Sequence, residues 1–153
     1  MVDEFHLEIS IPADEEGYVL LKCPNCGTYF KATPNDIEDE GVLEIYCPSC
    51  GLASDNYITE DILELALAMS KNKGMDVVYD ELKKMEREFS QGPVTFTVDN
   101  RVKREFEPII HSGIEALEKG TFLCCKRTAK LKPLLILTGC YCPFCGVKNY
   151  EIK

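Results

Sequence analysis

Two short motifs near the start of the chain, Cys23-Pro24-Asn25-Cys26-Gly27 and Cys47-Pro48-Ser49-Cys50-Gly51, decide how the sequence is interpreted. In each motif two residues separate the cysteines, so a tight turn can aim both sulfurs at one point. The glycine that follows lets the backbone curl beneath that point. Twenty residues lie between Cys26 and Cys47, enough for two strands and a turn to bring the motifs together. The spacing predicts a four-thiolate zinc site made by Cys23, Cys26, Cys47 and Cys50.

Nine cysteines could also form a disulfide scaffold or a pair of redox motifs. Disulfide scaffolds belong mainly to secreted proteins, whereas Met1-Val2-Asp3-Glu4 lacks the basic start and apolar stretch of a secretory signal. The cysteine count is odd, and no apolar run approaches the thickness of a bilayer. We therefore expect a metal protein that is cytoplasmic and has no membrane segment.

A second, degenerate copy of the motif pair ends the chain. Cys125 lies eight residues before Pro133, as Cys26 lies eight residues before Pro34. Tyr141-Cys142-Pro143-Phe144-Cys145-Gly146 likewise matches the segment from Tyr46 to Gly51. This alignment predicts a second zinc site and places Phe122 where Cys23 stands in the first. The expected ligands are Cys124, Cys125, Cys142 and Cys145, with Cys140 as the alternative fourth ligand. Two zinc ions are expected, and one at the minimum.

The motif pair resembles the zinc-ribbon superfamily over residues 18 to 58. That resemblance implies two facing knuckles linked by short antiparallel strands. It also implies that the chain serves as a protein-binding or nucleic-acid-binding part of a larger assembly. The central region of about 60 residues resembles no family.

The rest of the pattern predicts an α+β protein with two small antiparallel zinc ribbons flanking a central helical and strand segment. The expected segments are 1–58, 59–119 and 120–153. A leading strand is expected where apolar and polar residues alternate in 5–11. The central segment should contain a helix from Thr59 interrupted at Lys73-Gly74, a second helix from Asp76, a strand in 94–98 and a short helix from Ser112.

The sequence offers no convincing catalytic site. A four-thiolate zinc is coordinatively closed, whereas catalytic zinc keeps one position for water. The chain has two histidines, and its carboxylates are scattered. We therefore expect a non-enzymatic protein.

Charge is distributed unevenly along the chain and bears on the kind of partner. Residues 1–56 contain 12 acidic and 2 basic residues, whereas residues 109–153 contain 3 acidic and 7 basic residues. The acidic half would repel a phosphate backbone, so an adaptor that binds another protein is the first hypothesis. The alternative is nucleic-acid binding through basic residues of the C-terminal ribbon, namely Lys126, Arg127, Lys130 and Lys132. The sequence leaves the oligomeric state open.

Overall fold

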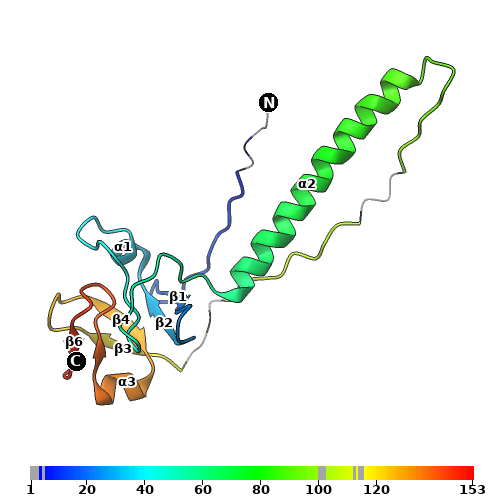
Figure 1. Ribbon diagram of the computed structural model, residues 1–153. Helices are drawn as coiled ribbons and strands as arrows, with labels where there is room; N and C mark the ends of the chain where they lie inside the picture. Colours follow the sequence, from blue (N-terminus) through cyan, green and yellow to red (C-terminus); the bar gives the residue numbers. More distant parts are fainter. Residues whose placement is uncertain (1–3, 5, 100–102, 112, 114–115) are drawn as a thin grey trace. The chain divides into compact units, whose positions relative to one another are not determined.

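The computed structural model describes residues 4, 6–99, 103–111, 113 and 116–153 (Figure 1). Helices and small antiparallel sheets are combined, in agreement with the expected α+β class. The helices are α1 (Pro34–Ile37), α2 (Glu60–Phe89) and α3 (Pro133–Thr138). The strands are β1 (Val19–Lys22), β2 (Tyr29–Ala32), β3 (Glu118–Thr121), β4 (Thr128–Leu131), β5 (Cys140–Tyr141) and β6 (Lys148–Asn149).

The chain forms two compact units. The first, the ribbon unit, contains Ser10–Glu60 and Ile110–Lys153. The second, the helical unit, contains Met1–Ile9 and Asp61–Ile109. This grouping differs from the expected division into 1–58, 59–119 and 120–153, because both cysteine-rich ends belong to one unit.

One four-stranded antiparallel sheet joins the two ribbons, with the strand order β1-β2-β4-β3 (Figure 1). β1 and β2 form the N-terminal hairpin, and β3 and β4 form the C-terminal hairpin. Both C-terminal strands, and the helix that follows them, begin 99 residues after their N-terminal counterparts. The hairpins meet where Lys31 of β2 lies opposite Lys130 of β4. The repeat in the sequence is therefore also a repeat in the structure.

The second cysteine motifs of the two repeats contact each other reciprocally. The N–H of Tyr46 donates to the carbonyl oxygen of Pro143 at 2.8 Å. In the same way, the N–H of Tyr141 donates to the carbonyl oxygen of Pro48 at 3.0 Å. These hydrogen bonds satisfy four backbone groups at once and relate the repeats by an approximate two-fold axis.

The same two tyrosines cover glycines of the opposite repeat. A Cβ atom on Gly51 would lie 3.0 Å from the Tyr141 ring, and one on Gly146 would lie 3.0 Å from the Tyr46 ring. Both glycines also have positive φ, +74° and +70°, which other residues rarely adopt. Glycine is therefore required twice over at these positions, by conformation and by the close approach of an aromatic ring.

The core of the ribbon unit combines residues of both hairpins, which pair edge to edge in one sheet. Phe30, Phe122 and Leu131 are completely buried there, together with several cysteines. The Phe30 ring meets the Tyr57 ring edge to face at 5.6 Å. Each buried phenylalanine contributes about 1.5–3 kcal/mol through the hydrophobic effect. Phe122 thus contributes to the core at the position where the first repeat has the ligand Cys23.

An acidic residue bridges the two lysines at the junction of the hairpins. Asp14 Oδ2 accepts hydrogen bonds from Lys31 Nζ at 3.2 Å and Lys130 Nζ at 2.7 Å. Asp14 Oδ1 accepts from the backbone N–H groups of Glu16 and Tyr18, each at 3.0 Å. Although burial opposes ionisation, these hydrogen bonds hold the pKa of Asp14 well below its usual range. Like charges directly opposite in a sheet repel, so the Asp14 carboxylate makes the junction of the hairpins possible.

The helical unit is built on one uninterrupted 30-residue helix, α2. The expected break at Lys73-Gly74 and the expected second helix from Asp76 are therefore wrong. A helix-interior glycine costs only about 1 kcal/mol relative to alanine. Tertiary contact offsets this cost, because the nearby Asn72 is buried and its amide donates to Glu105 O at 3.0 Å and to Glu107 Oε1 at 2.8 Å.

Three other local predictions fail. Residues 94–98 and the described residues of 5–11 are not strands, although apolar and polar residues alternate in both segments. Alternation alone does not make a strand, because its backbone groups need a neighbouring strand as hydrogen-bonding partner. The short helix expected from Ser112 lies partly outside the described residues, and its C-terminal end is strand β3.

Candidate metal centres

Four backbone turns of one kind place the candidate ligands. In each turn, the first residue donates its N–H to the carbonyl five residues ahead and accepts from the N–H four residues ahead. The turns begin at Cys23, Cys47, Phe122 and Cys142, with N···O distances of 2.8–3.0 Å. A left-handed residue occupies the fifth position of each turn, namely Gly27, Gly51, Lys126 and Gly146. Three of these positions have the glycine that the conformation favours, and Lys126 adopts it at φ 64°.

The first group combines the four sulfurs of Cys23, Cys26, Cys47 and Cys50, all within 4.8 Å of one another. Cys23 Sγ lies 3.7 Å from Cys50 Sγ, and Cys26 Sγ lies 3.4 Å from Cys47 Sγ. Sulfurs at about 2.3 Å from a tetrahedral ion would be roughly 3.8 Å apart, whereas a disulfide joins sulfurs at about 2.05 Å. All nine cysteines are free thiols. The spacing thus matches a four-thiolate metal site and not a pair of disulfides.

Backbone and side-chain groups are directed at these sulfurs. The N–H groups of Ser49 and Cys50 donate to Cys47 Sγ at 3.4 and 3.5 Å. Burial raises the pKa of Cys47. Hydrogen bonds involving Thr28 outweigh burial at Cys26 and lower its pKa to about 6. A metal ion would replace the thiol protons and offset the negative charge of the buried thiolates. Because protons compete with the metal for the sulfurs, metal binding should weaken in acid.

The second group contains Cys124, Cys125, Cys142 and Cys145, again with all four sulfurs within 4.8 Å. Cys125 Sγ lies 3.6 Å from Cys142 Sγ. Cys124 occupies the position equivalent to Asn25 of the first repeat, and the amide of Asn149 donates to its sulfur at 3.4 Å. The sulfur missing at Phe122 is therefore supplied from within the same turn, two residues further along the chain.

Cys140, the alternative fourth ligand, is not a member of this group. It is buried, with 2% of its surface exposed, and burial raises its pKa to about 11. Such a thiol stays protonated and serves as a small apolar side chain in the core.

A pair of cysteine variants distinguishes the two assignments. Cys124→Ser should remove one of two bound zinc ions, because serine is a poor zinc ligand and the remaining three sulfurs leave the site open. Cys140→Ala should keep both ions. Zinc counted by native mass spectrometry of the folded chain measures this directly. Loss of an ion from Cys140→Ala, with two ions kept by Cys124→Ser, would reverse the assignment.

The basic residues predicted for nucleic-acid binding do not form a free patch. Arg127 pairs with Asp36 at 3.4 Å and with Asp39 at 3.1 Å. Lys130 pairs with Asp14, as described above, and with Glu16 at 3.0 Å. Lys126 and Lys132 are exposed. The sequence did not indicate these ion pairs, because each joins segments that lie far apart in the chain.

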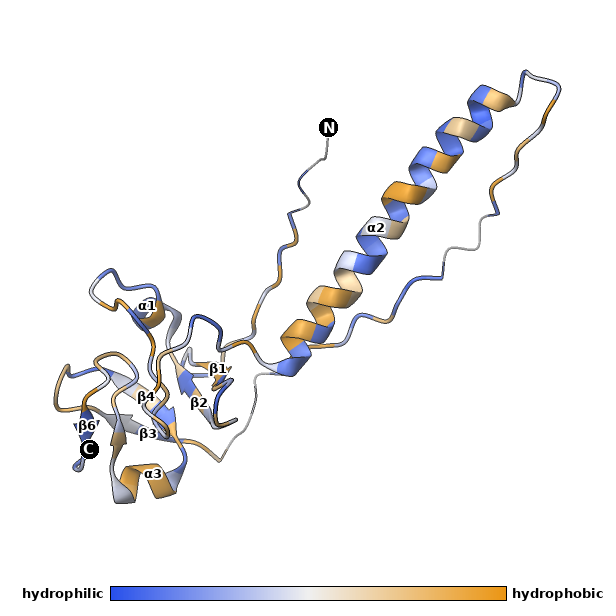
Figure 2. Ribbon diagram, viewed as in Figure 1, coloured by the Kyte–Doolittle hydropathy of each residue, from blue (hydrophilic) through white to orange (hydrophobic). Residues whose placement is uncertain are grey.

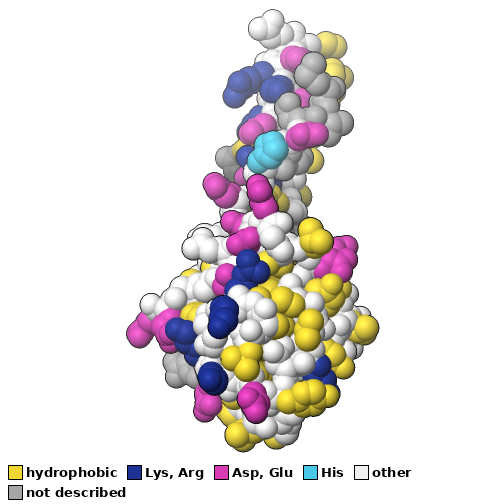
Figure 3. Space-filling view, turned by 90° about the vertical axis from the view of Figure 1, so that its left-hand side faces the viewer, with side chains coloured by type: hydrophobic (Ala, Val, Ile, Leu, Met, Phe, Trp, Pro, Cys, Tyr) yellow, Lys and Arg dark blue, Asp and Glu magenta, His cyan; other side chains and the backbone are white. Residues whose placement is uncertain are grey.

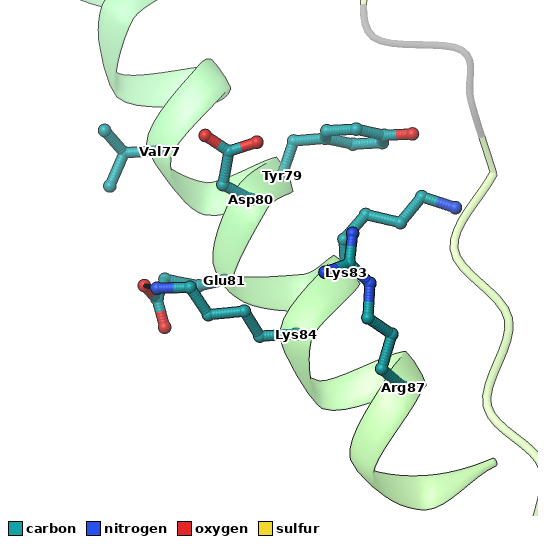
Figure 4. Close-up of a pocket in the computed structure, with 7 residues that line it drawn as sticks. All are labelled: Val77, Tyr79, Asp80, Glu81, Lys83, Lys84 and Arg87. Carbon is teal, nitrogen blue, oxygen red and sulfur yellow. Dashed lines mark hydrogen bonds and ion pairs between the residues drawn. The ribbon is translucent and has the colours of Figure 1, made fainter.

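A hollow on α2 has about 600 Å³ and is shown in Figure 4. Its lining mixes acidic and basic side chains, and Lys84 pairs with Glu81 at 2.6 Å. Over the described residues, the clusters of possible metal ligands are the two cysteine groups alone.

No protein-family model, curated protein or solved structure matches this chain. Among the described residues, no helix has the length and apolar character needed to cross a membrane. The two cysteine groups are compatible with metal binding of the zinc-ribbon kind.

Proposed function

We propose that this chain is a non-enzymatic zinc protein whose two four-thiolate sites hold a rigid adaptor for another protein. The observation that carries the proposal is the pair of cysteine groups, each with four sulfurs within 4.8 Å of one another. Soft thiolate ligands in a tetrahedron favour zinc among the common divalent ions, and four of them leave no position for water. The expected role of the metal is therefore structural.

Exposed apolar side chains on the ribbon unit support a protein partner. Leu134 and Leu137 of α3 are 68% and 81% exposed, and Tyr150 is 73% exposed. The Cβ of an alanine at Gly139 would lie 3.3 Å from the Tyr150 ring, which places this tyrosine beside the end of α3. Apolar and aromatic side chains at the surface are typical of protein-binding sites. Lysines and arginines in ion pairs, by contrast, offer less charge to a phosphate backbone.

A binding assay with matched variants tests the adaptor. Affinity purification from the source cell with the wild-type chain should recover a partner that the double variant Leu134→Ser, Leu137→Ser loses. Leu43→Ser changes an exposed leucine far from α3 in the sequence and should retain the partner. All three proteins should contain two zinc ions. Equal recovery by the double variant would place the binding surface elsewhere and contradict this assignment.

Nucleic-acid binding is the competing function, and a salt titration measures it. The full chain should show no mobility shift with DNA or RNA at physiological salt. If binding is seen, Lys126→Ala with Lys132→Ala should lower the slope of log affinity against log salt by roughly 0.7–0.9 for each phosphate that is no longer neutralised. These two lysines are suitable because they are exposed, whereas changes at Arg127 or Lys130 would also break ion pairs. Tight, salt-sensitive binding by the full chain would make nucleic acid the leading partner.

A further inference from the structure

One side of α2 has an apolar stripe, interrupted by Lys71 and Glu81, that the helical unit leaves exposed. Between 47% and 55% of each side chain is exposed at Leu63, Leu67, Val78, Met85 and Phe89. At about 100° per residue these positions lie within an arc of about 80°. Asn72 and Ala68, which are buried, lie on the other side of the helix. Figure 2 shows apolar residues recurring along the whole helix. The helix therefore buries one side within its own unit and leaves the apolar stripe exposed.

The stripe has an 11-residue repeat. Including the glycine, its positions are Leu63, Leu67, Gly74, Val78, Met85 and Phe89, in which the spacing of four and seven residues alternates. Eleven residues correspond to about 3.67 per turn, so the stripe stays on one side of a nearly straight helix. The six positions are also symmetric about residue 76, because the spacing is the same when it is counted from either end.

This symmetry makes the stripe complementary to itself in an antiparallel pair. Leu63 would lie opposite Phe89, Leu67 opposite Met85, and Gly74 opposite Val78. The central pair combines the smallest residue with a branched one, and a Cβ added at Gly74 would meet nothing within 4 Å. The open surface at Gly74 therefore has room for the Val78 side chain of another helix. Self-complementarity of this kind is what a two-fold interface requires.

The area available is sufficient for a stable dimer. At the end of α2, Met85 and Phe89 with Val94 and Phe96 line a wholly apolar groove of about 250 Å³. Leu63 of an antiparallel partner would face this groove. Complete coverage of the five stripe side chains with Val94 and Phe96, each exposing roughly 100 Å², would bury at most about 1,400 Å² per pair. Stable complexes bury about 1,200–2,000 Å².

We propose that the chain is a homodimer in which α2 pairs antiparallel with α2 of a second copy through this stripe. The space-filling view in Figure 3 shows hydrophobic side chains interspersed with charged ones on the face that it presents. The pairing depends on α2 and not on the metal, so it stands apart from the proposed zinc sites.

Sedimentation velocity of the full, zinc-loaded chain tests the dimer. The expected mass is twice the 17.3 kDa of one chain. Val78→Glu should raise the dissociation constant at least tenfold, because each dimer would then bury two unpaired carboxylates. Leu43→Glu makes the same kind of change at an exposed residue of the ribbon unit and should leave the dimer intact. Circular dichroism should show equal helix content in all three proteins.

An exchange of the central pair tests the antiparallel register. Gly74→Val and Val78→Gly should each weaken the dimer, and the double variant should restore it, because each copy then offers the same small and branched pair in exchanged positions. A monomer at all concentrations would overturn the proposal, even if the chain paired with a helix of another protein. A dimer that survives Val78→Glu, or a double variant no tighter than the single ones, would also overturn it.

Discussion

Replacing Cys50 with serine is expected to unfold the ribbon unit, and not only its N-terminal half. Structural zinc contributes on the order of 10 kcal/mol to small folds, and a site with three sulfurs loses most of it. From the sequence alone, unfolding would be expected only in residues 18–58. In the structure, the shared sheet β1-β2-β4-β3 and the common core of Phe30 and Phe122 should extend the unfolding to the C-terminal repeat.

Hydrogen exchange measures the extent of this unfolding. The amides of β1 and β2 should lose their protection in Cys50→Ser, and those of β3 and β4 should follow. Cys140→Ala is the matched control, since it removes a cysteine outside both groups. If protection in β3 and β4 survived in Cys50→Ser, the two ribbons would fold independently, contrary to the arrangement of the sheet.

Asp14→Asn should cause the second large loss of stability. The substitution keeps an oxygen that can accept from the backbone N–H groups, but it removes the charge between Lys31 and Lys130. Side-chain exposure is 5% for Lys31 and 15% for Asp14, so the lysine would be left buried without its counter-ion. Breaking a buried pair by removing one partner costs about 3–5 kcal/mol. Urea unfolding of the zinc-loaded protein gives the measurement.

Two further variants make this test specific. Glu16→Gln removes a half-exposed partner of Lys130 and should change the midpoint little. Lys31→Met, added to Asp14→Asn, should restore part of the lost stability because it removes the unpaired charge. An Asp14→Asn protein as stable as wild type would mean that the lysines tolerate each other without the carboxylate.

The pH dependence follows from the lowered pKa of Asp14. A carboxylate whose folded pKa lies below its unfolded value of about 3.9 contributes stability above that value. This contribution is lost as the pH falls towards the folded pKa. Protonation of the cysteine ligands removes zinc over an acidic range as well, so Asp14→Asn should differ most from wild type near neutral pH.

Features set by local spacing could be predicted from the sequence. The cysteine pairs and the glycines after them indicate the turns. The alignment of the two repeats shows that the second lacks one cysteine, because Phe122 stands where the first has Cys23. Cys124 belongs to the same turn as Cys125, and the structure groups its sulfur with those of Cys125, Cys142 and Cys145. The turn that begins at Phe122 keeps the same backbone hydrogen bonds as the turn that begins at Cys23. Cys124 can therefore supply a sulfur from this turn although a core phenylalanine stands at its first position.

Features that depend on distant contacts could not be predicted. Nothing in the alternation of residues shows that β2 pairs with β4, because Lys31 and Lys130 look like ordinary surface residues of edge strands. Asp14 belongs to a loop in an acidic stretch and looks like one solvated carboxylate among many. The continuity of α2 was missed for a similar reason, since the contacts of Asn72 with 105–107 offset the weak helix propensity of Gly74.

Every proposal for the ribbon unit depends on two zinc ions, each bound by four cysteine sulfurs. X-ray absorption at the zinc edge, combined with metal analysis of the same purified sample, is the decisive experiment. We predict two zinc ions per chain and a first shell of four sulfurs at about 2.3 Å, with no nitrogen or oxygen ligand. One ion per chain, or an average shell in which oxygen or nitrogen replaces sulfur, would contradict this assignment.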